Sequence, residues 1–167
     1  PELSGHPARQ AVEELTALGV ISGMGDGTFR PDAPLDRASF CTMAVKLLGL
    51  TPRWTDRFDD VAQSSWYGGY LCAAEEAGIT HGISARQFAP LRQVSREEGA
   101  VMLYRTARAM DLVSERQDGE ARSWTESLAW CREAGLWLWP EDADGTLTLL
   151  RGEAAQLLWA LTQMRKA

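Results

Sequence analysis

The sequence predicts a mainly α protein made of three tandem helix-loop-helix repeats. The first observation is a motif that recurs 59 residues later with unchanged spacing, from Gly19-Val20-Ile21-Ser22-Gly23 to Gly78-Ile79-Thr80-His81-Gly82. The second is that apolar residues on both sides of these loops follow helical spacing. The third is that no segment alternates apolar and polar residues for long enough to form a sheet. At most, short extended pieces are expected to flank Phe29 and Phe88.

The repeated unit extends beyond the glycine loop. The first two copies share a Phe-x-Pro triplet and an Arg-containing motif: Phe29-Arg30-Pro31 with Phe88-Ala89-Pro90, and Leu35-Asp36-Arg37 with Val94-Ser95-Arg96. A third, degenerate copy runs from Gly135-Leu136 to Leu149-Leu150-Arg151. Because a unit of about 50–60 residues rarely buries a sufficient core alone, the three copies are expected to fold as one body. The expected boundaries are residues 1–52, 53–113 and 114–167.

A first helix is expected before each loop. The residues seven and four positions ahead of the loop glycine are apolar and place one stripe on one helix face. They are Val12 and Leu15, Leu71 and Ala74, and Leu128 and Cys131. Gly19, Gly78 and Gly135 are expected to end these helices, because glycine readily adopts the left-handed conformation found there.

A second helix is expected to begin at each Arg-containing motif. Asp36 is a good N-cap, Ser95 with Glu98 predicts a complete capping box, and Leu150 cannot cap. After the first motif, apolar residues follow the i, i+3, i+4, i+7, i+8 pattern of an amphipathic helix: Phe40, Met43, Ala44, Leu47 and Leu48. Gly49 and Pro52 predict the end of this helix. Linkers are expected over residues 51–57 and 113–120.

Composition excludes several classes of protein. The chain of 167 residues carries a formal net charge of -6, which is unlike a nucleic-acid-binding protein. No apolar run approaches the ~20 residues that span a bilayer. The first residue is Pro1, and no signal-peptide pattern follows it, so the chain is expected to be a piece of a longer protein. Cys41, Cys72 and Cys131 lie among apolar or small residues and are expected to be free and buried.

The second copy resembles the repeat of the S-layer homology (SLH) domain family. The family repeat opens with F-x-D-V and a Trp, continues to G-I-x-x-G and F-x-P, and closes on T-R-A-E. In this chain the matching residues are Phe58-Asp59-Asp60-Val61, Trp66-Tyr67, Gly78-Ile79, Gly82, Phe88, Pro90 and Ser95-Arg96-Glu97-Glu98. The whole chain is similar to a three-repeat array of this family.

The resemblance implies a fold, a function and a location. The three repeats would pack as a pseudo-threefold helical bundle. The module would anchor a larger bacterial surface protein non-covalently to anionic secondary cell-wall polysaccharide, which often bears pyruvate ketals. Its location would be extracellular, at the cell wall or S-layer. The Arg of the closing motif would lie in grooves between neighbouring repeats and meet the acidic sugar.

The first and third copies depart from the family pattern. Copy one lacks F-x-D-V and has Pro7 where the Trp would stand. Copy three carries Trp137-Leu138-Trp139 in place of the second loop glycine, and Trp137 with Trp139 could form a hydrophobic plug there. A carbohydrate site on copy three is therefore in doubt.

Arg37, Arg96 and Arg151 stand at the first turn of a helix, where the helix dipole disfavours a cation. A bound anion would explain them, because guanidinium and free amide donors act together there, and Arg can grip a planar carboxylate with two parallel bonds. The alternative is a structural ion pair with a carboxylate of an adjacent repeat. For Arg151 the residues favour neither explanation.

The remaining candidate ligand-binding residues are in the loops and on one aromatic pair. Gly23 and Gly82 permit close backbone approach to a sugar, although ordinary turn geometry also accounts for them. Asp26 belongs to the first loop and is included. Trp66 and Tyr67 could stack on sugar rings, although aromatic residues at helical spacing are more often core.

The sequence favours no enzyme, metal or cofactor. The loops containing Asp26 and Asp144 lack the acidic residues that an EF-hand needs at its first and last positions. No catalytic Ser, Cys or His arrangement appears. The alternative to glycan anchoring is a degenerate repeat scaffold for protein–protein interaction or self-assembly.

Overall fold

The structure is a computed structural model that describes residues 2–23, 27–114 and 123–166. It contains the following helices: α1 (Arg9–Ala17), α2 (Arg37–Leu48), α3 (Gly68–Glu76), α4 (Arg96–Ala109), α5 (Trp124–Glu133) and α6 (Arg151–Lys166). Within the described ranges the extended segments form isolated bridges and no named strand. The mainly α prediction is confirmed. Asp26 and most of the expected linker over 113–120 lie outside the described residues.

Each repeat supplies one short and one longer helix, and the short ones end as the sequence predicted. Gly19, Gly78 and Gly135 directly follow the C-caps of α1, α3 and α5 and have φ angles of 75°, 79° and 75°. A side chain in this left-handed region costs roughly 1–2 kcal/mol, which explains glycine at all three ends.

The caps of α2 and α4 agree in part with expectation. Asp36 accepts a hydrogen bond from the Ser39 amide at 2.7 Å, and Ser95 accepts one from the Glu98 amide at 3.1 Å. The complete capping box predicted at Ser95 is wrong, because the carboxylate of Glu98 binds Nη2 of Arg92 at 3.1 Å instead. A cationic donor is a stronger partner for a carboxylate than a neutral amide.

A complete capping box occurs at the start of α5, where the sequence reading overlooked it. Ser123 accepts from the Glu126 amide, and the Glu126 carboxylate accepts from the Ser123 amide. At α6, where Leu150 cannot cap, Glu153 accepts from the Leu150 amide at 2.9 Å. The start of α6 therefore has only one of the two hydrogen bonds of a capping box, the one from the N-cap amide to the glutamate side chain.

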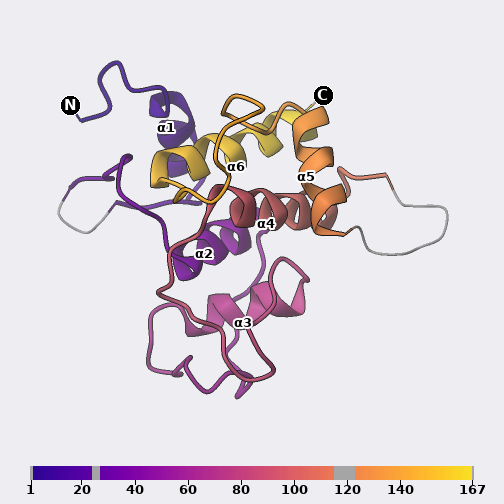
Figure 1. Cartoon of the computed structure of the whole chain (residues 1–167). Helices are drawn as coiled ribbons and strands as arrows, with labels where there is room; N and C mark the ends of the chain where they lie inside the picture. Colours follow the sequence, from indigo (N-terminus) through magenta and orange to yellow (C-terminus); the bar gives the residue numbers. More distant parts are fainter. Residues whose placement is uncertain (1, 24–26, 115–122, 167) are drawn as a thin grey trace.

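The helices of one repeat do not pack on each other. Instead, α3 packs on α2, α5 packs on α4 and α1 packs on α6, so each short helix covers the long helix of the preceding repeat (Figure 1). The long helices α2, α4 and α6 meet one another at the centre. The three copies therefore fold as one body, as expected, because the apolar face of each short helix is matched by a neighbour's long helix.

A closed ring of backbone hydrogen bonds joins the three repeats just before the long helices. The Leu35 amide donates to the Leu149 carbonyl at 3.0 Å, Leu149 donates to Val94 at 2.8 Å, and Val94 donates to Leu35 at 2.9 Å. Each strand-like segment thus pairs with both neighbours. This cyclic pairing gives the bundle its pseudo-threefold arrangement.

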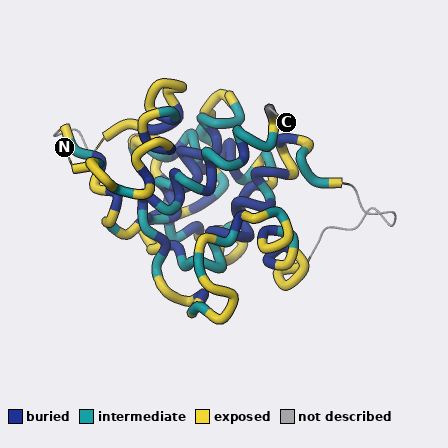
Figure 2. The backbone as a smooth tube through the Cα atoms, turned by 90° about the horizontal axis from the view of Figure 1, so that it is seen from above, coloured by how far each residue is buried: buried dark blue, intermediate teal, exposed yellow. Residues whose placement is uncertain are grey.

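The core lies between the long helices and the short helices that cover them (Figure 2). All six residues of the predicted stripes on the short helices are buried. Along α2, Phe40, Met43 and Ala44 are buried, while Leu47 and Leu48 are partly buried against the core. Cys41, Cys72 and Cys131 are free and buried, as predicted.

An acidic side chain fixes the Phe-x-Pro turn of each of the first two repeats. The Asp60 carboxylate accepts from the amides of Phe88 and Ala89 at 2.8 and 2.7 Å, and Ala89 has a φ of 59°. In the first repeat Glu2 accepts from the corresponding amides of Phe29 and Arg30. Glu2 therefore does in copy one what the Asp of F-x-D-V does in copy two, although the sequence reading found no such opening there.

Candidate functional site

The arginine of each closing motif reaches into the loop of the next repeat. Arg37 is 6% exposed and lies over the ring of Phe88, with Cζ 4.7 Å from the centroid. Its Nε donates to the Phe88 carbonyl at 3.1 Å, and its Nη2 donates to the His81 carbonyl at 2.7 Å. The nearest carboxylate oxygen, on Glu98, is 3.8 Å from Nη1.

Arg151 and Arg96 repeat this arrangement around the ring. Arg151 is 8% exposed, lies 4.5 Å from the Phe29 ring centroid and donates through Nε to the Phe29 carbonyl at 2.8 Å. Arg96 lies over Trp139 at 4.7 Å, and its Nη1 donates to the Asp144 carbonyl at 3.4 Å. Its buried Nε has no partner among the described residues. Backbone carbonyls and aromatic rings, more than carboxylates, thus hold the motif arginines.

One groove of about 540 Å³ opens between the second repeat and its neighbours; we call it the second-repeat groove. Its walls are loop residues 80–83 and one side of α4, closed by Arg37 from the first repeat and Trp124 from the third. The charged side chains that line it are Arg37, Arg92, Arg105, Glu97 and Glu98. Gly82 lies in this groove.

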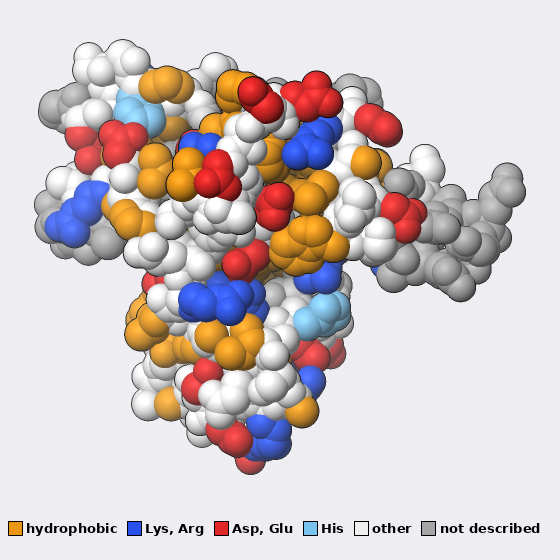
Figure 3. Space-filling view, viewed as in Figure 1, with side chains coloured by type: hydrophobic (Ala, Val, Ile, Leu, Met, Phe, Trp, Pro, Cys, Tyr) orange, Lys and Arg blue, Asp and Glu red, His pale blue; other side chains and the backbone are white. Residues whose placement is uncertain are grey.

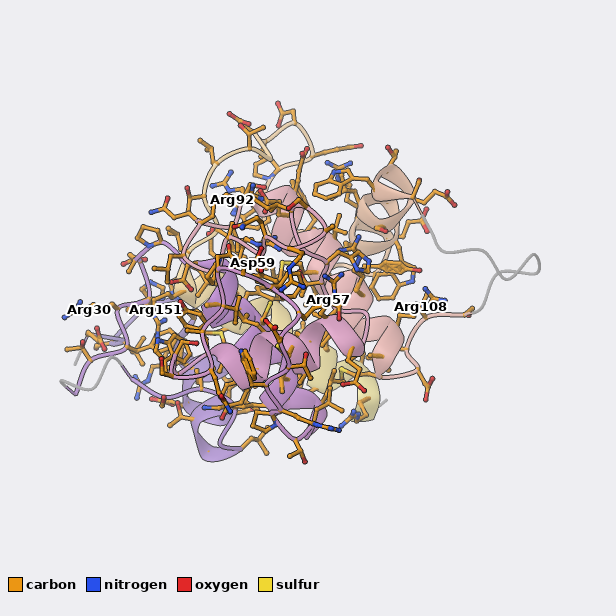
Figure 4. All side chains as sticks on the ribbon, turned by 90° about the horizontal axis from the view of Figure 1, so that it is seen from below. Arg30, Arg57, Asp59, Arg92, Arg108 and Arg151 are labelled. Carbon is orange, nitrogen blue, oxygen red and sulfur yellow. The ribbon has the colours of Figure 1, made fainter. Side chains whose placement is uncertain are left out.

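An equivalent first-repeat groove, of about 580 Å³, lies between loop residues 20–23 and α2. Arg151 from the third repeat and Trp66 from the second close it, so that Gly23, Arg151 and Trp66 come together. Lys46 and Tyr70 also line it, with the Lys46 ammonium 5.5 Å from the Tyr70 ring centroid. In Figure 4 Arg151 lies beside Arg30 at one side of the molecule, whereas Arg108 lies at the other.

Both grooves carry a second cation that the sequence reading did not single out. Lys46 and Arg105 each follow the motif arginine of their own helix by nine residues, and Ala160 holds this place in the third repeat. Arg105 has no hydrogen bond or ion pair with any residue that the structure describes, unlike Arg92, which binds Glu98 at 3.1 Å. The helical spacing after the motif was the signal that would have revealed these cations.

In the third repeat, Trp139 occupies the loop region that faces the motif arginine. Trp139 lies under Arg96, donates through Nε1 to Glu153 at 2.7 Å and meets Trp137 edge-on at 4.9 Å between ring centroids. The plug suggested by the sequence is therefore present. Arg96 lines neither of the two grooves described above.

Of the aromatic pair named from the sequence, only one residue lines a groove. Trp66 and Tyr67 meet edge-on at 5.3 Å, but only Trp66, 61% exposed, lines the first-repeat groove; Tyr67 lines neither groove. Tyr70 stands in its place, and Trp124, 46% exposed, is the counterpart of Trp66 in the second-repeat groove. Both grooves thus offer one accessible indole.

The loop glycines are required by the loops themselves. A Cβ on Gly82 would lie 2.6 Å from the Gln87 carbonyl oxygen and 2.6 Å from Phe58, and one on Gly23 would lie 2.6 Å from the Thr28 carbonyl oxygen. These distances are too short for a side chain. Turn geometry therefore accounts for both glycines whether or not a sugar lies against them.

Burial disfavours the charged form of several basic groups in the second-repeat groove relative to the neutral form. It lowers the pKa of both Arg37 and Arg105 from their ordinary value; the charge of Arg37 lowers the pKa of Arg105 further, and the charge of Arg92 lowers that of Arg37. Burial, and then the charge of Arg105, lower the pKa of His81, while Glu75 opposes this effect. Both guanidiniums stay charged at neutral pH, and a bound anion would relieve the unfavourable proximity of Arg37 and Arg105.

Acidic and basic side chains alternate over the face shown in Figure 3 and do not form one large charged patch. In residues 2–23, 27–114 and 123–166, no group of three or more His, Cys, Asp or Glu side chains is placed to hold a metal ion. Over the same ranges, no helix combines the length and apolar character needed to cross a membrane. Anion recognition here would therefore be local, within the grooves.

The S-layer homology domain model matches residues 3–41 and 57–100. The chain belongs to the S-layer homology domain family. The matched segments contain the first repeat through the start of α2 and the second through the start of α4, so they include Arg37, Arg96 and both groove loops. Helices α5 and α6 lie outside the matched segments.

Curated relatives agree with this assignment. A surface-layer 125 kDa protein of Lysinibacillus sphaericus is 37% identical over 102 residues, which are 61% of this chain and 9% of that protein. S-layer protein EA1 of Bacillus anthracis is 32% identical over 113 residues, 66% of this chain and 13% of its own length. An endo-1,4-beta-xylanase A of Thermoanaerobacterium saccharolyticum is 32% identical over 92 residues, 54% of this chain and 8% of the enzyme.

These alignments cover about a tenth of each relative, so this chain corresponds to one module of much longer proteins. The same module occurs beside a xylanase, but the aligned part is only 8% of that enzyme. The family and the surface-layer relatives place the chain among cell-surface, cell-wall associated proteins.

Proposed function

We propose that this SLH module anchors a larger surface protein to anionic secondary cell-wall polysaccharide, with pyruvate ketals as the acidic groups, through its first- and second-repeat grooves. The observation that carries the proposal is the recurrence of one set of side chains in both grooves. Each has a motif arginine from the preceding repeat, a second cation on its own long helix and an exposed tryptophan from the following repeat.

The third position keeps the motif arginine of the preceding repeat, Arg96, but lacks the other two members of this set. Ala160 replaces the second cation, Pro7 replaces the exposed tryptophan, and Trp139 fills the space. The second cation and the exposed tryptophan are thus both absent at this position. Their joint loss in the repeat that departs most from the family motif supports a shared ligand-binding role in the other two.

The two cations in each groove have different roles. Nε and Nη2 of Arg37 donate to loop carbonyls, and Nε of Arg151 donates to the Phe29 carbonyl, so both arginines shape the groove walls and add positive potential. The side chains of Arg105 and Lys46 have no hydrogen bond or ion pair with another residue that the structure describes, and they can form charge-assisted bonds to a carboxylate. Trp124 and Trp66 can then stack on the apolar face of a sugar ring. Gly82 and Gly23 let the loop backbone lie close to it.

The test compares binding of two glycans to the purified chain by calorimetry. The first is pyruvylated wall polysaccharide, and the second is the same material after mild acid has removed the ketals. We expect the first to bind at least about tenfold more tightly, because a charge-assisted bond contributes about 1.5–3 kcal/mol. Equal affinity for the two glycans would overturn the carboxylate assignment.

Substitutions assign the site. Arg105→Ala and Lys46→Ala are each expected to remove one binding site, since each leaves the other groove intact. Arg108→Ala is the matched control, because it removes an exposed cation from the last turn of the same helix, outside the groove. A loss of binding that is as large for Arg108→Ala as for Arg105→Ala would show that only overall charge matters.

A scaffold without glycan binding is the second candidate, and one observation favours it. The motif arginines bind loop carbonyls of the neighbouring repeats, which alone gives them a structural reason to exist. If the scaffold proposal is right, Arg37→Ala lowers the melting temperature, and neither the wild-type chain nor any variant binds wall glycan of either kind.

A further inference from the structure

The two grooves differ in one titratable side chain at the same loop position. His81 lines the second-repeat groove, whereas Ser22 occupies the matching place in the first-repeat groove. The chain has only two histidines, and the other, His6, is bonded to Asp32 at 2.9 Å away from both grooves. The repeat pattern therefore provides a natural comparison between a groove with an imidazole and one without.

His81 lines the groove, and its backbone holds the loop in place. Its carbonyl accepts the Arg37 Nη2 hydrogen bond at 2.7 Å, which fixes the loop. Charged groups face the loop from every side: Arg105, Glu97 and Glu98 on α4, Glu75 on α3 with its partner Arg57, Arg37 on α2, and Arg92. Glu98 is already engaged by Arg92 and Arg37, and Arg105 is the residue of α4 whose charge acts on the pKa of His81.

This environment disfavours the protonated form of the His81 imidazole. Burial, followed by the charge of Arg105, lowers the pKa of His81 from its ordinary value, and Glu75 compensates only in part. An anion bound to Arg105 would cancel the repulsion and give the imidazolium a partner of opposite charge. By linkage, a ligand that raises the pKa of His81 must bind more tightly when His81 is protonated.

We propose that His81 makes the second-repeat groove a proton-sensitive anion site, which binds its acidic glycan more tightly as the pH falls below neutrality, while the first-repeat groove does not share this response. The inference rests on the proposed function, since it concerns the same grooves. The expected gain is about threefold to tenfold between about pH 7.5 and about pH 5, the size of a one-charge interaction at a partly exposed site. The ketal carboxylate stays ionised over this range, because a carboxyl group with an electron-withdrawing substituent on its α-carbon has a pKa of about 3.5.

The direct measurement is an NMR titration of the two histidine ring signals, with and without pyruvylated wall glycan. We expect the glycan to raise the pKa of His81 by about half to one unit and to leave the pKa of His6 unchanged, because His6 lies outside both grooves. Unchanged titration of His81 in a sample saturated with glycan would overturn the inference.

Matched substitutions provide the second measurement. Lys46→Ala is used as background to silence the first-repeat groove, and Arg105→Ala to silence the second. In the first background His81→Ser should remove most of the gain in affinity at low pH, and what remains belongs to the other acidic groups of the groove. In the second background Ser22→His should introduce a gain. Both changes fall on exposed loop residues and exchange amino acids that the other repeat already carries there.

The two proposals fail in different ways. If the wild-type chain binds no pyruvylated glycan at any pH, the proposed function is wrong and the inference falls with it. If the glycan binds, but wild type and His81→Ser show the same pH dependence, the proposed function stands and the role of His81 is refuted.

Discussion

Nη2 of Arg37 lies 2.7 Å from the carbonyl oxygen of His81 and donates to it across the boundary between the first and second repeats. The first residue of α2 thereby holds the loop that forms one wall of the second-repeat groove. The same guanidinium donates to Phe88 and covers its ring. One side chain thus couples the packing of two repeats to the shape of a groove.

Replacing Arg37 with Ala should destabilise the whole bundle. The change removes three hydrogen bonds from a buried guanidinium, to the carbonyls of Phe88 and His81 and to the Thr80 hydroxyl, and a cation–π contact, so the free energy of unfolding should fall by about 2–4 kcal/mol. Urea denaturation measures this change. Arg9→Ala is the control, because Arg9 is exposed and has only an i, i+4 partner; a change within about 0.5 kcal/mol is expected there. Equal effects of the two variants would contradict the structural role of Arg37.

The sequence predicted that the motif arginines meet the neighbouring repeat but not what they bind there. Their position in a repeated motif was visible, because repetition shows directly in spacing. Their partners are carbonyls of Phe88, His81 and Phe29, and a carbonyl has no sequence signal since every residue carries one. The same limit explains why the pairing of α1 with α6 was missed: an apolar stripe shows that a helix needs a partner, but not which partner.

The groove residues could be predicted where a motif recurs and not where only geometry selects them. Gly23, Gly82 and Trp66 belong to repeated motifs, and the fold brings each to a groove. In the sequence, Lys46 and Arg105 look like ordinary surface cations of a helix; only the folded structure shows that both lie beside a groove loop. Tyr67 was preferred to Tyr70 because it adjoins Trp66 in sequence, whereas one helical turn decides which ring faces α2.

Ala89→Gly should stabilise the protein. Ala89 has a φ of 59°, which costs a non-glycine residue about 1 kcal/mol or more. The hydrogen bond from its backbone N–H to the Asp60 carboxylate is kept in the glycine variant. Part of this gain is lost to the greater freedom of glycine in the unfolded chain, so a net gain of about 0.5 kcal/mol is expected. Gly49→Ala tests the same physics in reverse, since Gly49 has a φ of 70° and open space around it; it should lose about 1 kcal/mol. If both variants change stability in the same direction, the backbone argument fails.

Alkaline pH should destabilise the protein through its buried thiols. Burial raises the pKa of Cys41 and of Cys131 from 9.0 to about 12, so the native state retains protons that the unfolded chain releases. The free energy of unfolding should therefore be unaffected by these thiols below about pH 8.5 and fall from about pH 9 toward 12, by at most about 1.4 kcal/mol per pH unit for each thiol.

Urea denaturation at about pH 8 and about pH 10.5 tests this dependence. The Cys41→Ala, Cys131→Ala double variant is less stable at both values because it leaves cavities, but it should show a smaller decrease between them. A decrease as large as that of the wild-type protein would mean that other groups cause the alkaline effect.

Removing the third repeat should unfold the first as well. In a chain ending at residue 113, α1 loses α6 and α4 loses α5, although both segments that match the family model are still complete. The ring that joins Leu35, Val94 and Leu149 is also opened. The truncated chain is therefore expected to lack a cooperative thermal transition and to show poorly dispersed amide signals.

A circular permutant separates loss of neighbours from loss of chain continuity. It joins residue 167 to residue 1 through a flexible linker of about 15 residues and opens the chain between α2 and α3. Every helix then keeps the partner that it has in the native bundle, so the permutant should unfold cooperatively within a few degrees of the parent. A stable, cooperatively folded 1–113 fragment would show instead that two repeats can close on each other, and that the cyclic exchange of helices is dispensable.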